Sequence, residues 1–197
     1  YAYSTCYLLV GVGFLSGAMV KHGLHKRIAL GIVSKVGKKP TTLILGFIIA
    51  VGFVSMWMSN TTATVMMLPV ALAISSTLGD NAAGLKKAMV LAIPYAATIG
   101  GMATVIGTTT NPTGIGLIRE TIGIDIDFLD WMKIGLPFTV ILIPFFRLYM
   151  VKFFKVDKMP PTDISIARRQ YEELGPMNKG EKWVAAIFVL CVILWVT

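Results

Sequence analysis

Long uncharged apolar stretches alternate with short charged segments along this chain. The stretches without any Asp, Glu, Lys or Arg are residues 1–20, 40–79, 88–118, 134–146 and 183–197. A helix that crosses a bilayer needs roughly 20 mostly apolar residues, and several of these stretches are long enough. The pattern therefore predicts an all-α polytopic membrane protein.

Neutral polar residues interrupt the second stretch at Ser59-Asn60-Thr61-Thr62, between arms 41–58 and 63–78. Two arrangements fit this pattern: a pair of spanning helices with a tight external turn, or a re-entrant hairpin whose tip stops near the middle of the membrane. The tip lacks the charge or the Gly/Pro signal of an external turn. This favours a re-entrant hairpin at 41–78, because non-helical backbone at membrane depth must line a protein cavity.

The third stretch is interrupted at Gly100-Gly101 and again at 107–116, where Thr, Asn, Pro and Gly predominate. Such residues disfavour a straight helix, and Pro112 suits the first turn of a second helical half. We expect a broken helix at 86–122 with an unwound middle. A kinked helix with packing glycines is the alternative.

The net charge of +8 is a topology signal rather than a sign of nucleic-acid binding. Basic residues crowd 21–39, 86–87 and 152–182, whereas 119–133 is acidic, and basic loops mark the cytoplasmic side. We expect a scaffold helix and an interfacial helix in 1–40, half of a transport domain in 41–156 that ends with a helix at 131–156, a cytoplasmic interfacial segment at 157–182, and the start of the next scaffold helix at 183–197. His22 and His25 are expected to be solvated at the interface.

The two polar breaks are the candidate binding site. A broken helix exposes free N–H groups at one end and free C=O groups at the other; the N–H end attracts anions, and neutral oxygens suit a hard cation. No Lys or Arg lies near either break, so a bound cation could supply the charge that an anion requires. Polar residues that merely join neighbouring helices are the alternative.

These breaks carry a resemblance to the divalent anion/sodium symporter family. Ser55-Met-Trp-Met-Ser59-Asn60-Thr61-Thr62-Ala63-Thr64, followed by Met67-Leu68-Pro69, is similar to its Ser-Asn-Thr signature. Gly100 to Thr108, followed by Asn111, is similar to its second stretch, although Thr110 replaces a common Pro. Leu24 to Leu30 resembles its interfacial helix. The resemblance covers nearly the whole chain, about 14–197.

The resemblance implies one inverted repeat of an elevator-type transporter, usually a homodimer, with sodium as the coupling ion. It implies sodium ligands and substrate contacts at matching positions; Thr108 and Asn111 are additional candidates. The sodium-binding candidates are Ser55, Ser59, Asn60, Gly107 and Thr108. The substrate-binding candidates are Asn60, Thr61 and Asn111.

The expected function is sodium-coupled symport of small dicarboxylates such as succinate or citrate in a bacterial inner membrane or plasma membrane. A sodium-coupled carrier of sulfate or another inorganic anion is the alternative. An enzyme is not expected, because the histidines lie in a loop and no Asp lies in an apolar stretch. Since the chain begins at Tyr1 and ends at Thr197 in apolar runs, we expect it to be about half of a transporter whose second repeat is missing.

Overall fold

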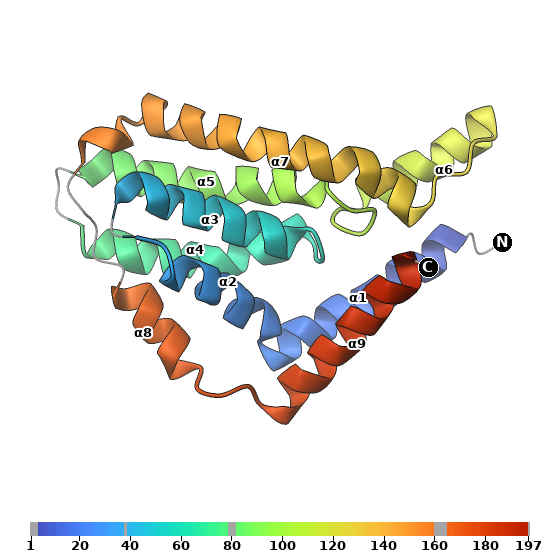
Figure 1. Ribbon diagram of the computed structural model, residues 1–197, viewed down its shortest axis with the longest axis horizontal. Coiled ribbons are helices and arrows are strands. Elements are labelled where there is room, and N and C mark those ends of the chain that lie inside the picture. The colour runs from blue at the N-terminus through green and yellow to red at the C-terminus, as the bar shows by residue number, and fades with distance from the viewer. Residues whose placement is uncertain (1–3, 38, 79–81, 160–164, 197) are drawn as a thin grey trace.

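The computed structural model describes residues 4–37, 39–78, 82–159 and 165–196, and all regular structure in these ranges is helical (Figure 1). The prediction of an all-α protein is therefore confirmed. The elements in chain order are α1 (Ser4–His22), α2 (Leu24–Ser34), α3 (Pro40–Ser55), α4 (Asn60–Ser76), α5 (Ala83–Gly101), α6 (Thr110–Ile122), α7 (Phe128–Phe153), the short 3-10 helix η2 (Val156–Lys158), α8 (Ser165–Glu173) and α9 (Lys179–Val196).

Local sequence signals explain where several helices begin and end. Gly23 and Gly123 have φ angles of 77° and 71° and follow α1 and α6, which is the left-handed geometry that glycine adopts most readily after a helix. Pro40 occupies the first turn of α3, where its missing N–H costs no hydrogen bond. Asp127 caps α7 by accepting a hydrogen bond from the Asp130 backbone N–H at 2.7 Å.

A bundle of α3, α4, α5 and α7 forms the larger part of the molecule (Figure 1). Phe47 and Ile48 of α3 are completely buried in it. Helices α3 and α5 approach closely at Gly52 and Gly100, where the backbone of α3 leaves no room for a Cβ on Gly100. Small residues permit such close approach in membrane helix packing, so this contact sets the spacing at the end of the bundle that holds the polar breaks.

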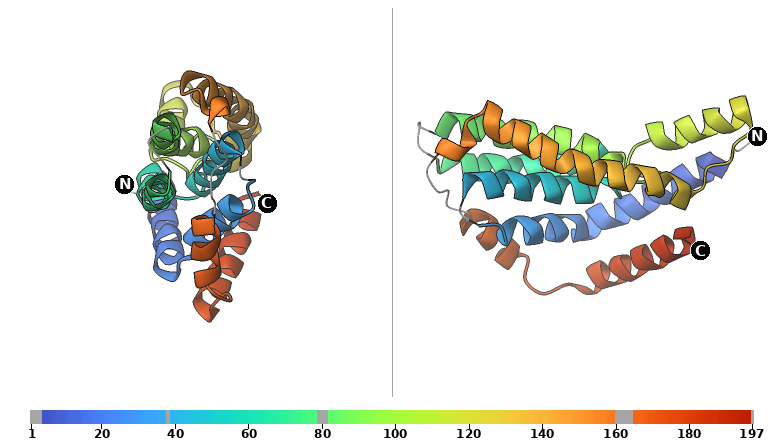
Figure 2. Two further views of the ribbon diagram at one scale, coloured as in Figure 1. Left: turned by 90° about the vertical axis from the view of Figure 1, so that its left-hand side faces the viewer. Right: turned by 45° about the horizontal axis from the view of Figure 1, so that its top comes forward.

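Helices α1 and α9 lie beside one another and diverge from the bundle, and α2 and α8 connect them to it (Figures 1 and 2). Within the described ranges, α7 is the one helix that is long and apolar enough to cross a membrane by length and composition. It has 26 residues, and only 11% of its most apolar 18-residue segment is buried. The apolar helices α3 and α4 are shorter, at 16 and 17 residues.

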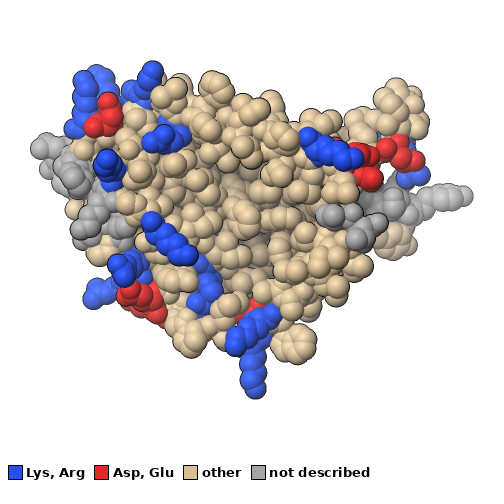
Figure 3. Space-filling view, viewed as in Figure 1, with Lys and Arg blue, Asp and Glu red and all other residues tan. Residues whose placement is uncertain are grey.

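Charged side chains gather at the edges of the face shown in Figure 3, and uncharged surface lies between them. The loop between α6 and α7 contains exposed Asp125 and Asp127. Many large apolar side chains are exposed elsewhere, including Phe138 and Phe145 of α7. A surface of this kind fits contact with lipid or with another apolar surface rather than with water.

The expectation that both histidines are solvated is wrong for His25, which is 7% exposed. The turn at Gly23 folds α2 back against α1, and His25 Nδ1 lies 2.9 Å from the Met19 carbonyl oxygen. Burial lowers the pKa of His25, and the positive charge of Lys26 lowers it further, against the opposing effect of the Met19 hydrogen bond.

Candidate binding site at two helix breaks

The first break joins α3 to α4 through residues 56–59. Ser55, the last residue of α3, is completely buried, and its Oγ donates a hydrogen bond to Oδ1 of Asn60 at 2.7 Å. Ser59 caps α4, because its Oγ accepts the Thr62 backbone N–H at 3.2 Å. The Ser55 hydroxyl and the Asn60 amide therefore meet across the turn, and Ser59 caps the start of α4.

The second break joins α5 to α6 through residues 102–109. Asn111, in the first turn of α6, is 7% exposed, and its Nδ2 donates to the carbonyl oxygens of Gly101 and Thr104 at 2.9 and 2.7 Å. Gly107 packs on the backbone of Gly101, which leaves no room for a Cβ on Gly107. The Asn111 side chain and Gly107 thus hold the loop against the end of α5.

The two breaks are in direct contact, and their loops lie side by side in Figure 1. The Asn60 side chain lies against Gly101 and leaves no room for a Cβ there. The buried Thr104 hydroxyl donates to the Met56 carbonyl oxygen. Residues that are 48 positions apart are therefore joined, and the two polar clusters form one region.

Helix α7 packs against the second break and holds it in place. Trp131 Nε1 donates to the Met102 carbonyl oxygen at 3.0 Å, and Thr139 Oγ1 donates to the Ile99 carbonyl oxygen at 3.0 Å. Gly135 lies between them and packs against the Met102 and Ala103 carbonyls. These contacts satisfy carbonyl groups that the end of α5 would otherwise leave unpaired.

Opposite helix ends meet in this region. The carbonyl ends of α3 and α5 lie next to the N–H ends of α4 and α6, because each break joins one end of each kind. The partial positive charge of an N-terminus attracts an anion and the partial negative charge of a C-terminus attracts a cation. Among the described residues there is no group of three or more His, Cys, Asp or Glu side chains that could hold a metal ion. Residues 40–79 and 88–118 contain no Asp or Glu, so the two breaks offer a cation neutral oxygens, which hard cations accept.

The structure brings some candidate residues together and leaves others at the edge. Ser55 and Asn60 are in contact, and Gly107 and Asn111 reach the same Gly101 backbone that Asn60 contacts. The remaining candidates lie outside this contact group: Ser59 and Thr61 are exposed, and the half-buried Thr108 has its hydroxyl 3.3 Å from that of Thr110.

The sequence did not point to Thr104, Trp131 or Thr139, which hold the second break in place. The signal for Thr104 was its position as a lone hydroxyl between Ala103 and Val105. Trp131 and Thr139 lie eight residues apart on α7, and only the packing of α7 against α5 reveals their partners.

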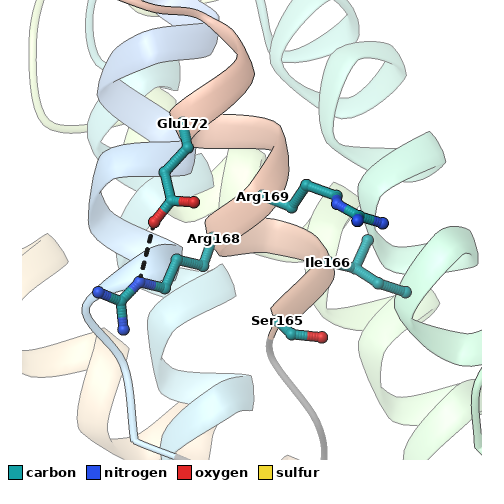
Figure 4. Close-up of a pocket in the computed structure, with 5 residues that line it drawn as sticks. All are labelled: Ser165, Ile166, Arg168, Arg169 and Glu172. Carbon is teal, nitrogen blue, oxygen red and sulfur yellow. Dashed lines mark hydrogen bonds and ion pairs between the residues drawn. The ribbon is translucent and has the colours of Figure 1, made fainter.

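A separate pocket lies on α8, outside the two breaks, and is lined by Ser165, Ile166, Arg168, Arg169 and Glu172 (Figure 4). Arg168 Nε pairs with Glu172 Oε1 at 3.2 Å, whereas Arg169 points away from that pair (Figure 4). The ion pair is exposed on both sides, so it contributes little to stability. The pocket shares none of its residues with the helix breaks.

Comparisons with known proteins identify similar membrane transporters. The family model described as the sodium:sulfate symporter transmembrane region matches residues 1–197. Sodium-dependent dicarboxylate transporters named SdcS, from Staphylococcus aureus strains USA300 and NCTC 8325, are each 36% identical over 208 residues. These alignments cover 100% of this chain and 40% of the relative.

The chain therefore spans about two fifths of the length of these curated relatives. The family description and the relatives' names are those of membrane transporters and not of enzymes, as the sequence predicted. The chain belongs to the divalent anion/sodium symporter family, whose transmembrane region the matching family model describes.

Proposed function

We propose that this chain is part of a sodium-coupled symporter of small dicarboxylates, and that the two helix breaks form its half of the binding site. The observation that carries the proposal is the contact between the breaks, where Asn60 lies against Gly101 and Thr104 bonds to Met56. This contact places hydroxyl, amide and backbone oxygens next to two helix N-termini. The relatives' name supplies the substrate class and the ion.

We propose that sodium binds to oxygens of the first break and of the loop that follows α5. Ser55 Oγ and Asn60 Oδ1 already converge at 2.7 Å, and the backbone around Gly107 adds carbonyl oxygens. Ser59 and Thr108 would complete the site after a side-chain rotation, because Ser59 Oγ now lies 2.7 Å from the Thr62 hydroxyl. All of these oxygens are neutral, as a hard monovalent cation tolerates.

The carboxylate binds beside the cation, at the N-terminal ends of α4 and α6. Thr61 is exposed in the first turn of α4, where free N–H groups and the helix dipole favour an anion. Asn111 stands at the corresponding position of α6, where its Nδ2 donates to the Gly101 and Thr104 carbonyl oxygens, so it would contact the carboxylate after one of these bonds opens. No Lys or Arg occurs within 40–79 or 88–118, so sodium provides the countercharge. This makes anion binding depend on sodium binding.

The arrangement in the membrane follows from helix length and charge. The 16 residues of α3 span about 24 Å, which is less than the roughly 30 Å thickness of the hydrocarbon core. We infer that α3 and α4 are the arms of a re-entrant hairpin and that α5 and α6 are the halves of a broken helix. Discontinuous helices of this kind mark the substrate site in many secondary transporters.

The remainder of the transporter is also part of the proposal. A second inverted repeat, outside this chain, would supply the other sodium ligands and substrate contacts. We infer elevator-type movement of the α3–α7 region against α1 and α9, a homodimer, and a plasma-membrane location. In Figure 1, α1 and α9 run at an angle to α3, α4 and α5 and meet the bundle through contacts such as Trp57 with Phe188, which is compatible with a division into a moving and a static part.

The experiment that tests the proposal is uptake of labelled succinate by the full-length protein in proteoliposomes. An inward sodium gradient should drive accumulation, and an equal potassium gradient should not. Unlabelled succinate and citrate should compete, whereas sulfate should not. Sodium-driven uptake of labelled sulfate, without uptake of labelled succinate, would favour the second candidate, a sodium-coupled sulfate carrier, which the family's description supports. Uptake that ignores sodium would contradict both.

A further inference from the structure

Arg27 of α2 makes the most extensive set of polar contacts of any described arginine. Its Nε and Nη2 donate to the two carboxylate oxygens of Glu181 at 2.8 and 3.1 Å, and its Nη1 and Nη2 donate to the carbonyl oxygens of Gly175 and Leu174 at 2.8 and 3.1 Å. The side chains of Arg27 and Glu181 are only 12% and 4% exposed. A buried bidentate pair of this kind has a defined geometry that an exposed pair lacks.

Glu181 also fixes the start of α9. Its Oε2 accepts the Asn178 backbone N–H at 2.8 Å, and its own backbone N–H donates to Asn178 Oδ1 at 2.8 Å. This reciprocal arrangement is a capping box. One carboxylate therefore caps α9 and binds Arg27, which fixes the first turn of α9 relative to α2.

The end of α1 is held at the same junction. His25 binds the Met19 carbonyl across the turn at Gly23, and the His22 ring lies so close to Gly180 that a Cβ has no room there. We define the α1–α2–α9 junction as His22, His25, Arg27, Gly180 and Glu181. Figure 1 shows that α1 and α9 run from this junction away from α8.

We propose that Arg27 is a positioning residue for transport, which holds α1, α2 and α9 together as the static body against which the α3–α7 region moves. This inference rests on the proposed function. Arg27 lies on the connection from α1 to the bundle, and it binds carbonyls in the connection from α8 to α9. One side chain thus fixes both connections, while the candidate binding residues lie on other elements.

The role predicts a specific kinetic signature. Without the pair, α2 and α9 shift independently, so domain movement slows while the binding site keeps its geometry. In the full-length transporter, Arg27→Gln should lower the maximal rate of sodium-driven succinate uptake roughly tenfold or more, with KM and sodium-dependent succinate binding unchanged. The matched control is Arg168→Gln, which removes an exposed Arg–Glu pair on α8 and should leave the rate unchanged.

A cross-link between positions 27 and 181 distinguishes a junction that stays closed during transport from an ion pair that must open. Arg27→Cys combined with Glu181→Cys should transport slowly, and reaction of the two cysteines with a short bismaleimide should restore the rate. Because the cross-link replaces the ion pair, this variant also tests the role if Arg27→Gln fails to fold. Inhibition by the cross-link, or a normal maximal rate for Arg27→Gln, would overturn the proposal. Wild-type protein without sodium-driven uptake would instead contradict the proposed function.

Discussion

Ser55 and Asn60, which end α3 and begin α4, are joined by a hydrogen bond of 2.7 Å between Oγ and Oδ1. The bond closes the first helix break and points two oxygens at one another beside the second break. A cation placed there would coordinate both oxygens, and the Ser55 O–H would turn away with its proton, so the cation would replace the hydrogen bond as the link between the two side chains. The same two side chains would then hold the turn in both the empty and the occupied site.

Removal of the Asn60 amide should abolish coupled uptake. Asn60→Ala removes Oδ1, which accepts the Ser55 hydrogen bond, lies against Gly101 and is the proposed cation ligand. It also removes the amide nitrogen, the proposed hydrogen-bond donor to the substrate carboxylate. Sodium-driven succinate uptake in proteoliposomes should fall to the background rate. Ser76→Ala, which removes an exposed hydroxyl at the other end of α4, is the control and should transport normally. Unchanged uptake by Asn60→Ala would remove Asn60 from the site.

A methyl group at Gly101 should displace Asn60 without removing any polar atom. The Asn60 side chain occupies the position that a Cβ on Gly101 would take, so Gly101→Ala overpacks the contact at a cost of about 1–3 kcal/mol. We expect weaker sodium-dependent succinate binding and a lower melting temperature in detergent. Gly114→Ala is the matched control, because a Cβ at Gly114 meets no atom within 4 Å. Equal effects of the two substitutions would show that the contact is unimportant.

Cysteine labelling should establish the direction of the chain. A cysteine at Asp127, which is exposed between α6 and α7, should react with an impermeant maleimide from outside intact cells. A cysteine at Ala83, exposed at the start of α5, should react only after the membrane is permeabilised. Neighbouring Gly84 is unsuitable, because the Phe154 carbonyl and the Met159 side chain leave no room for a larger residue. The opposite labelling pattern would reverse the topology.

Buried His25 should make the protein sensitive to acid. Its pKa is lowered from the ordinary 6.5 by burial, so the unfolded chain binds this proton more readily than the folded protein does. The stabilisation is complete above pH 6.5 and is lost as the pH falls through the lower pKa of the folded state. The melting temperature should therefore decrease below pH 6.5, and His25→Gln should weaken that dependence. An unchanged dependence in His25→Gln would contradict the assignment.

Much of the fold could be predicted because the relevant signals are local. The break at Ser59-Asn60 follows from a capping serine, and the interruption at Gly100-Gly101 coincides with the end of α5 at Gly101. Pro112 lies in the first turn of α6, as expected for a helix start. Helix propensity and capping are encoded within a few residues, so a single sequence reveals them.

The contacts between distant segments could not be predicted. The Arg27–Glu181 pair joins residues 154 positions apart, and basic residues near a membrane are expected to face lipid headgroups or water. His25 was misplaced for the same reason, because only the fold brings the Met19 carbonyl to its ring. Thr104 bonds to Met56 only because Gly52 and Gly100 bring α3 and α5 together.

In the proposed mechanism, bound sodium supplies the charge that the anion needs at the contact between the two breaks. Calorimetric titration of the full-length protein measures this directly, with succinate titrated at several sodium concentrations and sodium at several succinate concentrations. If sodium has this role, each ligand should tighten binding of the other by the same factor. Succinate affinity that is independent of sodium would contradict it.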